Sequence, residues 1–402
     1  MITTLKIEKT VYGGDGLGHL GDGRVVFVPG AYTGETVRAE IKEERKGFVK
    51  ARLVEIDTPS PERRDAADDM LKTPGIVYGD LTLAGEIQEK CGQISEFLQR
   101  SRIEHPAVIS PRATEGDDGL HYRNKIVYHF EKQKGDWAIG YRAGLENSVV
   151  DMTSDPLACP AINAELGAIR SKVKMLLGQG SINVRRSIEA KRDVTIRWTE
   201  RTGVCWWLGK SADGQVLREF TAGHIFDVPA DGFYQVNPKV GDELVKRVVR
   251  RITTEPCDEL VDLYCGVGVF GICGASEMKR AHLTGIESGR RAVEFARRNA
   301  KLAGLEDATF SALEIGRNLR QIKVPQDATV IIDPPRGGLE KGVAQFLARG
   351  MARRIYYVSC DPATLMRDLK TLSGAYRINY VEWFNMFPRT ARFETLVELI
   401  RR

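Results

Sequence analysis

The C-terminal part of the chain alternates between apolar strands and helices, and this alternation restricts the possible folds more than any other feature of the sequence. After Asp231 a strand, a glycine turn and a helix follow one another several times. Strands that alternate with helices build a parallel sheet, because each helix returns the chain to the same end of the sheet. The sequence therefore predicts a doubly wound α/β domain over residues 231–402. Its strands are expected at 260–264, 283–287, 329–333 and 354–359.

Two smaller parts precede this domain. Residues 1–57 consist of short β-type runs around a glycine-rich stretch at 13–23, a pattern typical of a small OB-like β-barrel. A linker with two prolines follows at 57–61 and marks a boundary. Residues 70–230 mix helices with strands and predict an α+β middle domain. Its helices are expected at 84–100 and near 161–177, and its strands include 125–130 and 194–198.

The charge and the hydropathy of the chain favour a cytoplasmic protein. The 402 residues include 59 basic and 54 acidic side chains, which gives a net charge of +5. This mild basic excess suits a nucleic-acid partner without requiring one. No apolar run reaches the roughly 18 residues that cross a membrane, and the first residues lack the apolar core of a signal peptide. We therefore expect no membrane contact.

Seven cysteines are scattered along the chain without a Cys-x-x-Cys pair. This spacing favours neither a disulfide framework nor a zinc site, so we expect reduced thiols and no metal. One of them, Cys360, lies where a predicted strand gives way to a helix. A helix N-terminus lowers the pKa of a nearby thiol, and a partly exposed thiolate is a competent nucleophile. A buried cysteine that only fills space is the alternative.

A glycine-rich turn after the first strand of the α/β domain indicates a cofactor site. Gly266 and Gly268 let the backbone approach a ligand, and Glu287 ends the next strand, where a carboxylate can accept the hydroxyls of a ribose. Gly271 completes a Gly-x-Gly-x-x-Gly pattern, so periodicity alone does not separate a dehydrogenase from a methyltransferase. The third strand favours a methyltransferase. It ends in Asp333-Pro334-Pro335-Arg336, a stiff loop beside the crevice for which a dehydrogenase has no need.

Five motifs in this order resemble the RNA uracil-5 methyltransferases, the family that methylates uridines of ribosomal and transfer RNA. They lie at 233–237, 262–270, 332–336, 357–361 and 387–395. Residues 1–57 resemble the TRAM barrel, an RNA-binding module that members acting on ribosomal RNA often carry. The resemblance implies a Rossmann-like class I methyltransferase domain, S-adenosylmethionine as the methyl donor and RNA as the substrate.

Position by position, the resemblance implies that Cys360 is the nucleophile and Glu394 the general base. Carbon 5 of uracil is a weak nucleophile, so a thiolate must first add to carbon 6 and turn the ring into an enolate. After methylation a carboxylate must remove the proton from carbon 5, which lets the thiolate leave. The residues implied to surround S-adenosylmethionine are Gln235, Tyr264, Gly266, Glu287 and Asp333.

Three further residues are implied to meet RNA. Phe233 would stack on a target base, although a core aromatic gives the same sequence. Arg123 and Lys125 belong to a Tyr-Arg-Asn-Lys segment that would meet phosphates, although an exposed charged strand end looks the same. The TRAM-like barrel favours 23S ribosomal RNA as the substrate, and we expect a monomer. Transfer RNA, cytosine-5 methylation of RNA and a catalytically idle RNA-binding protein are the alternatives.

The chain departs from the family where many relatives hold an iron–sulfur cluster. Those relatives supply three cysteines ahead of the middle domain and a fourth in a Cys-Pro pair. Residues 71–90 contain no cysteine here, and only Cys159-Pro160 is left. Four thiolates hold such a cluster, so we expect none. Near the implied base, Asn385 and Ala391-Arg392 replace an aspartate and a pair of histidines, and Asp361 replaces an asparagine after the nucleophile.

Overall fold

The computed structural model describes residues 1–402 apart from 66–67, 115, 145–146, 179–190, 213 and 279–280. The chain divides into two compact units. Unit 1 comprises Met1–Arg102, Ser110–Leu120 and Asn385–Phe393, and unit 2 comprises Ile103–Ile109, His121–Phe384 and Glu394–Arg402. Among the described residues no helix is both long enough and apolar enough to span a membrane.

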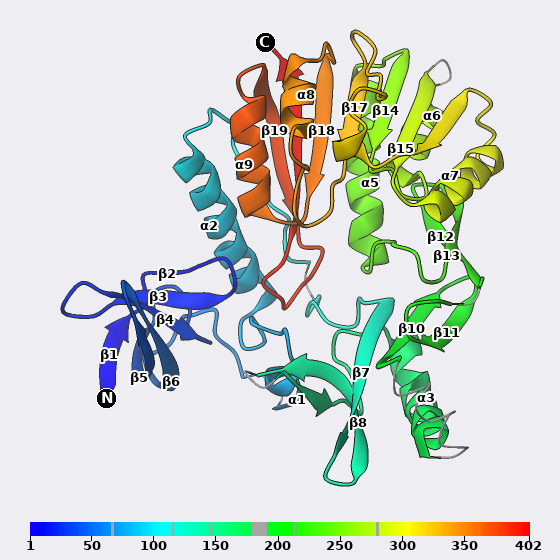
Figure 1. The fold of residues 1–402 in the computed structure, drawn as a ribbon. Helices are drawn as coiled ribbons and strands as arrows, with labels where there is room; N and C mark the ends of the chain where they lie inside the picture. The colour runs from blue at the N-terminus through cyan, green and yellow to red at the C-terminus, as the bar shows by residue number, and fades with distance from the viewer. Residues whose placement is uncertain (66–67, 115, 145–146, 179–190, 213, 279–280) are drawn as a thin grey trace. The chain divides into compact units, whose positions relative to one another are not determined.

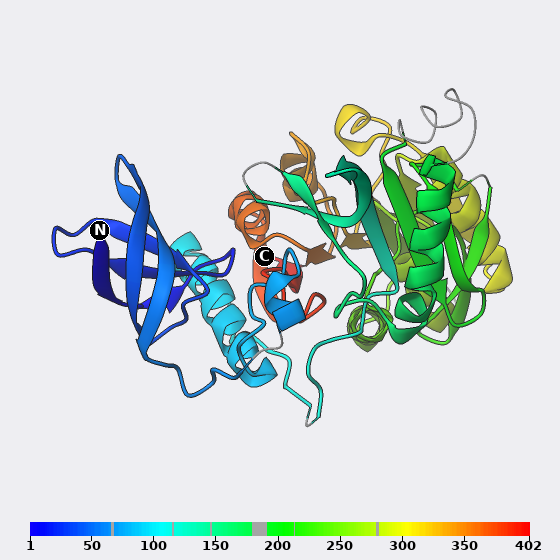
Figure 2. The same ribbon diagram turned by 90° about the horizontal axis from the view of Figure 1, so that it is seen from below.

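Unit 1 begins with a six-stranded sheet, drawn in blue in Figures 1 and 2. Its strands are β1 (Ile2–Lys6), β2 (Lys9–Thr10), β3 (Asp15–His19), β4 (Val25–Pro29), β5 (Thr36–Arg45) and β6 (Phe48–Thr58), in the order β1-β5-β6-β4-β3-β2. Alternate side chains point inward, so that Val26 and Val28 of β4 are fully buried with Val37 and Ala39 of β5. The sheet confirms the β structure predicted for residues 1–57.

Two helices follow in unit 1, α1 (Asp68–Lys72) and α2 (Leu83–Ser101). Side chains of α2 bind the strand-rich part directly. The Gln93 amide donates to the carbonyl of Val11 at 3.2 Å, and the Thr33 hydroxyl donates to Glu89 at 2.6 Å. With these bonds, residues 70–102 belong to the same compact unit as the barrel, and the domain bounds expected from the sequence stay a prediction.

Unit 2 contains a five-stranded antiparallel sheet in the order β11-β10-β7-β8-β9. Helix α3 (Pro160–Gly178) covers it, and Leu166 and Val173 of the helix share a buried cluster with Ile126 and Ile196 of the strands. A hairpin of β12 (Val216–Thr221) and β13 (His224–Pro229) follows. The strands are β7 (Lys125–Gln133), β8 (Asp136–Ala143), β9 (Ser148–Asp151), β10 (Asp193–Thr199) and β11 (Gly203–Leu208).

The second sheet of unit 2 has seven strands in the order β16-β15-β14-β17-β18-β20-β19. They are β14 (Glu259–Leu263), β15 (His282–Glu287), β16 (Ala308–Ala312), β17 (Thr329–Ile332), β18 (Arg354–Ser359), β19 (Tyr376–Phe384) and β20 (Glu394–Arg401). The helices are α5 (Pro238–Thr254), α6 (Val269–Glu277), α7 (Arg290–Leu302), α8 (Val343–Arg349) and α9 (Pro362–Leu372), with a short 3-10 turn at Ile315–Arg317. β17 and β18 are buried along their whole length, as in sheets covered on both faces, and Figure 1 shows α8 and α9 beside β18 and β19.

The strand order determines where this sheet can bind a ligand. From β14 the chain builds outward through β15 to β16 on one side, and through β17 to β18 on the other. Open α/β sheets bind ligands at such a reversal, outside the carboxyl ends of the strands. β20 runs antiparallel to β18, so its first residue, Glu394, lies at the same edge as the residues that follow β14, β17 and β18.

The third glycine of the Gly-x-Gly-x-x-Gly pattern is required for packing. A Cβ on Gly271 would lie 2.8 Å from Asp262 Oδ2 and 2.8 Å from Leu283 Cδ1, because α6 lies directly against β14 and β15 at this point. The N–H of Gly271 also donates to Asp262 Oδ2 at 2.8 Å. The close approach of helix and sheet therefore depends on a missing side chain.

We predict that Gly271→Ala lowers the free energy of unfolding by about 1–3 kcal/mol, the usual cost of overpacking. The matched control is Gly167→Ala in the middle of α3, where a Cβ meets no described atom within 4 Å. That change should raise the stability by up to about 1 kcal/mol, because alanine favours a helix over glycine. Urea unfolding of the two variants measures both effects, and equal midpoints would contradict the packing argument.

Candidate active site

A pocket opens at the ligand-binding edge of unit 2, and its largely apolar lining with a few polar groups is typical of small-molecule sites. The predicted residues Phe233, Gln235, Tyr264, Gly266 and Asp333 all line it. Most of the other lining side chains are apolar, among them Val245, Val267, Val269 and Phe270. The structure thus brings together residues that the sequence placed on three different segments.

The turn after β14 holds its backbone in a conformation that few residues adopt. Tyr264 has a φ of 65°, and Gly266 and Gly268 have φ values of 54° and 90°. A left-handed tyrosine is strained, and strained residues gather at functional sites. A Cβ on Gly266 would meet no described atom within 4 Å, so a ligand has room to approach the backbone at this turn.

Glu287 supports the same turn from the end of β15. Its Oε2 accepts the N–H of Gly266 at 3.2 Å, and its Oε1 accepts the N–H of Gly289 at 2.8 Å. Carboxylate oxygens accept more than one hydrogen bond, so this oriented group can still receive the hydroxyls of a ribose. The open backbone, the apolar walls and the oriented carboxylate fit S-adenosylmethionine. When bound, this cofactor supplies an electrophilic methyl group.

Phe233 lies at the pocket with 71% of its surface exposed, which excludes the alternative of a core aromatic. The Tyr-Arg-Asn-Lys segment at 122–125 contacts the residues on either side of Phe233. The N–H of Asn124 donates to the carbonyl of Val236 at 2.9 Å, and the ammonium of Lys125 donates to the carbonyl of Gly232 at 3.4 Å. Two motifs that are distant in sequence therefore meet beside the pocket.

Neither basic side chain of that segment is a fully solvated cation. Arg123 is partly buried, and its Nε donates to the hydroxyl of Tyr122 at 3.3 Å. Burial and the nearby charge of Arg197 lower the pKa of Lys125 to about 8. The described contacts give the Tyr-Arg-Asn-Lys segment a structural role next to Phe233. That Arg123 and Lys125 contact RNA phosphates stays a prediction.

The sheet register makes Cys360 and Glu394 neighbours. The ladder of β18 and β20 ends with Ser359 opposite Thr395, and Cys360 and Glu394 are the next residues at this end, close enough for the Glu394 carboxylate to raise the pKa of the thiol. Cys360 is partly buried and Glu394 is 5% exposed. The predicted nucleophile and the predicted base thus come from adjacent strands.

The pKa of Cys360 differs from the prediction. Burial, then the carboxylates of Glu394 and Asp333, raise the pKa of this thiol to about 12. The N-terminus of α9 is capped by Asp361, whose carboxylate accepts two N–H groups of the first turn at 3.0 and 3.1 Å. The expected lowering by the helix is therefore wrong for the free protein. Burial and these carboxylates therefore favour the protonated thiol.

Glu394 lies in an environment that favours its protonated form. Its Oε2 is buried and has no hydrogen-bond partner in the described part of the chain. Burial, then the charge of Asp333, raise the pKa of Glu394 well above its usual value, and burial raises the pKa of Asp333 to about 7. A carboxylate with a raised pKa binds a proton more tightly, which is the property a general base needs.

Arg336 is a residue of the site that the sequence analysis noted only as part of a loop. The side chain is exposed, and its positive charge lowers the pKa of both Cys360 and Glu394. A cation placed here stabilises negative charge that develops near the thiol and the carboxyl group. The signal was present in the sequence, since Arg336 directly follows the two prolines after Asp333.

In the described residues no three His, Cys, Asp or Glu side chains lie close enough to hold a metal ion. Cys159 is buried, and its N–H donates to the carbonyl of Arg123 at 2.8 Å. Burial raises the pKa of its thiol. Cys159 packs in the middle sheet's cluster, and the absence of an iron–sulfur cluster stays a prediction.

The strand order and the pocket at its reversal point define a class I methyltransferase domain that uses S-adenosylmethionine. Residues 215–402 match the family model of tRNA (Uracil-5-)-methyltransferase, and residues 2–54 match that of the TRAM domain. Residues 215–402 are thus similar to the RNA uracil-5 methyltransferases, and residues 2–54 carry the predicted TRAM domain.

Relatives align with the chain over nearly its full length. An uncharacterized RNA methyltransferase of Thermotoga maritima is 26% identical and covers 100% of this chain and 99% of its own. The 23S rRNA (uracil(1939)-C(5))-methyltransferase RlmD of Vibrio cholerae is 26% identical over 98% of this chain and 95% of its own. The crystal structure of Pyrococcus abyssi tRNA (uracil-54, C5)-methyltransferase with S-adenosyl-L-homocysteine has a TM-score of 0.73 and 22% identity, and covers 98% of this chain and 100% of its own. This likeness confirms the predicted fold.

We predict that iodoacetamide alkylates Cys360 slowly at neutral pH and ever faster up to about pH 11, since a raised pKa moves the appearance of the thiolate to higher pH. Asp333→Asn removes a carboxylate that is ionised at about pH 9 and should therefore speed alkylation there. Mass spectrometry of the peptide that contains Cys360 measures the rates. A plateau near pH 8 would show that the thiol is acidic after all.

Proposed function

We propose that the enzyme methylates carbon 5 of a uridine in 23S ribosomal RNA through a covalent bond between Cys360 and carbon 6 of the base. The observation that carries the proposal is that Cys360, directly after β18, and Glu394, the first residue of β20, lie at the same edge of the sheet, close enough for the Glu394 carboxylate to raise the pKa of the thiol. A thiol and a carboxyl group side by side meet the two demands of the reaction, a nucleophile for carbon 6 and a base for carbon 5.

The reaction proceeds in steps that these side chains can perform. The Cys360 thiol loses its proton to a neighbouring carboxylate or to water as its sulfur attacks carbon 6. The electrons of the carbon 5–carbon 6 double bond move to oxygen 4. Carbon 5 of this enolate then takes up the methyl group as the bond from that methyl to the sulfonium of S-adenosylmethionine breaks and leaves a thioether. Glu394, in its ionised form, then removes the proton from carbon 5, the double bond re-forms, and the bond from carbon 6 to sulfur breaks, which releases the thiolate.

The buried surroundings of the two side chains favour this order of events. In the free protein the protonated thiol is unreactive, so Cys360 is protected until a base displaces water from the site. Arg336 faces the same groups and would stabilise the enolate as negative charge develops. Phe233, exposed at the pocket, would stack on the uracil once it has left its neighbours.

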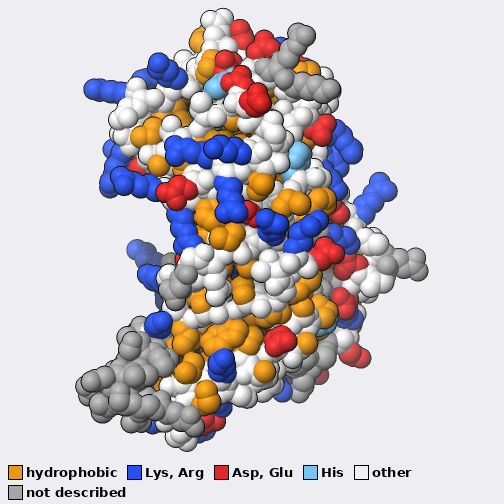
Figure 3. Space-filling view, turned by 90° about the vertical axis from the view of Figure 1, so that its right-hand side faces the viewer, with side chains coloured by type: hydrophobic (Ala, Val, Ile, Leu, Met, Phe, Trp, Pro, Cys, Tyr) orange, Lys and Arg blue, Asp and Glu red, His pale blue; other side chains and the backbone are white. Residues whose placement is uncertain are grey.

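Ribosomal RNA is the substrate that the observations favour. The TRAM domain and the relation to RlmD of Vibrio cholerae, named as a 23S rRNA enzyme, both support it. Figure 3 shows Lys and Arg side chains on the face that carries α7 and the hairpin of β12 and β13, where Arg297, Arg298 and Lys301 are exposed. Such a basic surface attracts the phosphates of an RNA.

We predict that substitutions of Cys360 and of Glu394 block the reaction at different steps. Cys360→Ala should abolish both methylation and covalent attachment to RNA, since no enolate forms. Glu394→Gln should still add to the base and accept the methyl group but not release the product. A methylated protein–RNA adduct should then survive denaturing electrophoresis, with turnover lowered by about 10²-fold.

Cys257→Ala, a change of the same kind in a partly buried cysteine outside the pocket, serves as the control and should leave turnover unchanged. Full turnover of the Glu394 variant, or an adduct formed by the Cys360 variant, would mean that the roles are assigned wrongly.

We further predict that deletion of the gene removes one 5-methyluridine from 23S ribosomal RNA and leaves transfer RNA unchanged. Nucleoside mass spectrometry of the two separated RNA fractions measures this. Loss of 5-methyluridine from transfer RNA would instead identify transfer RNA as the substrate. Loss of 5-methylcytidine would identify a cytosine-5 enzyme, and no change in either nucleoside would favour an idle binding protein.

A further inference from the structure

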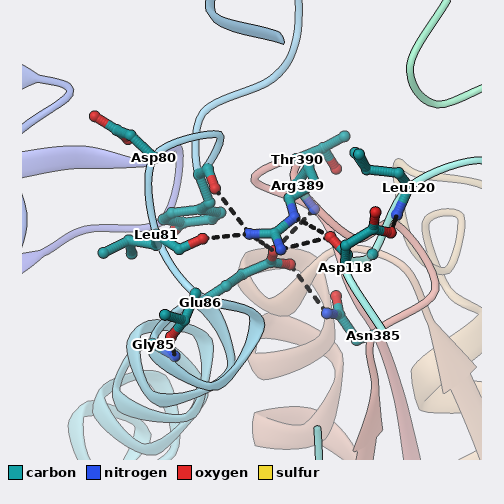
Figure 4. Close-up of polar contacts among 12 residues, drawn as sticks. Asp80, Leu81, Gly85, Glu86, Asp118, Leu120, Asn385, Arg389 and Thr390 are labelled. Atoms are coloured by element: carbon teal, nitrogen blue, oxygen red, sulfur yellow. Dashed lines mark hydrogen bonds and ion pairs between the residues drawn. The ribbon is translucent and has the colours of Figure 1, made fainter. Parts of the chain in front are cut away.

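Unit 1 contains a buried charge cluster made of Glu86 and Lys90 from α2 and of Asn385 and Arg389 from the segment Asn385–Phe393. Figure 4 shows Glu86, Asn385 and Arg389 of this cluster. Glu86, Lys90 and Arg389 are 0% exposed, and Asn385 is 7% exposed. Two of these side chains are cations and one is an anion. The pocket described above includes none of the four residues.

Lys90 joins α2 to the segment through three hydrogen bonds. Its ammonium donates to Glu86 Oε1 at 2.7 Å, to Asn385 Oδ1 at 2.7 Å and to the carbonyl of Phe387 at 3.2 Å. The amide of Asn385 donates in turn to Glu86 Oε1 at 3.0 Å. Each proton of the ammonium thus has its own acceptor, and two of the three acceptors belong to the segment.

Arg389 is held at both its backbone and its side chain. Its N–H donates to Glu86 Oε2 at 2.9 Å, and its guanidinium donates to the carbonyls of Leu81 at 2.7 Å, Tyr78 at 3.1 Å and Asp118 at 2.7 Å. Its φ is 67°, a left-handed conformation that is strained for a residue with a side chain. Surrounding contacts must impose such a conformation, and the bonds to Glu86 and to the three carbonyls do so.

A cluster of this composition is costly for a core. Burying three charges requires each to be paired, and apolar side chains of the same volume often stabilise a protein as well or better. What the charges add is a unique geometry, because their hydrogen bonds are satisfied in one arrangement of the segment and not in others. The cluster therefore holds the segment Asn385–Phe393 in one conformation.

The position of the segment in the chain indicates why precision is needed. Asn385–Phe393 connects the end of β19 to the start of β20, and the next residue is Glu394. The side chain of Glu394 must reach the carbon 5 proton of a base bound to Cys360, and a displacement of about 1 Å lowers such rates by about 10²-fold. How the chain enters β20 therefore affects the base directly.

We propose that Glu86, Lys90 and Arg389 are positioning residues that fix the segment and, through it, the placement of Glu394 for proton removal. The inference rests on the proposed role of Glu394 as the base. Its signature is specific: loosening the segment should slow the release of product more than the attack by Cys360, since the thiol lies at the end of β18, on another part of the chain.

The test uses the full-length enzyme with Lys90→Met, which keeps the length of the side chain and removes its charge. We expect methylated protein–RNA adduct to accumulate, turnover to fall by about 10-fold or more, and the rate of adduct formation to stay within about 3-fold of the wild type. Arg170→Met is the matched control. It removes another buried cation, paired with Asp151 in unit 2, and should lower stability without accumulating adduct.

If Lys90→Met does not fold, Asn385→Ala removes the amide alone and should give the same imbalance between the two steps at a smaller size. Glu394→Gln is measured alongside. If it accumulates adduct and the Lys90 and Asn385 variants release product normally, the inference fails and the proposed function stands. If no variant, Glu394→Gln included, accumulates adduct, the assignment of the base fails and takes the inference with it. Equal slowing of all steps in Lys90→Met and Arg170→Met would also overturn the inference.

Discussion

The antiparallel entry of β20 into an otherwise parallel set of strands is the constraint on which the site depends. In a purely parallel sheet, only residues at the carboxyl ends of strands reach the ligand edge. β20 reverses that rule beside β18, so the start of one strand meets the end of its neighbour. Cys360 and Glu394 lie at the same edge for this reason, and no loop has to carry either of them to the other.

The edge created in this way is crowded with acidic groups. Asp333, Glu394 and the cap residue Asp361 all face the sulfur of Cys360, while Arg336 is the cation that acts on it. Burial adds to the effect, because a charge in a medium of low polarizability is costly. Burial and the nearby carboxylates raise the pKa of the Cys360 thiol, and burial and Asp333 raise the pKa of Glu394. A raised pKa gives a carboxylate the higher affinity for a proton that a base requires.

Much of the catalytic half was predictable from the sequence because its signals are local. The alternation of strands and helices predicted the sheet, and Tyr264, Glu287, Asp333 and Cys360 could be placed at its ligand edge because each lies at or directly after the end of a strand. Local patterns could not predict that residues 70–102 belong to the unit of the barrel. That association depends on side chains such as Gln93 and Glu89, whose partners are far away in the sequence.

The pKa of Cys360 escaped prediction for a related reason. A helix N-terminus is visible in the sequence, but the carboxylates that oppose its effect come from β20 and from the loop after β17. The buried charge cluster leaves no periodic trace either, since Glu86 and Arg389 are separated by 303 positions. The sequence showed only that Asn385 and Ala391-Arg392 depart from the family pattern near the base.

This separation has a consequence for the order in which the molecule assembles. Glu86 and Lys90 leave the ribosome long before Arg389 and Asn385 are made, yet all four belong to unit 1. Domains usually fold as they emerge, N-terminal first, but this one must wait for nearly the whole chain before its charges find their partners. The N-terminal unit is therefore the last to be completed, and a long loop must close before its core is finished. Synthesis interrupted before Asn385 would leave Glu86 and Lys90 on α2 with each other as partners and without the groups of the segment Asn385–Phe393.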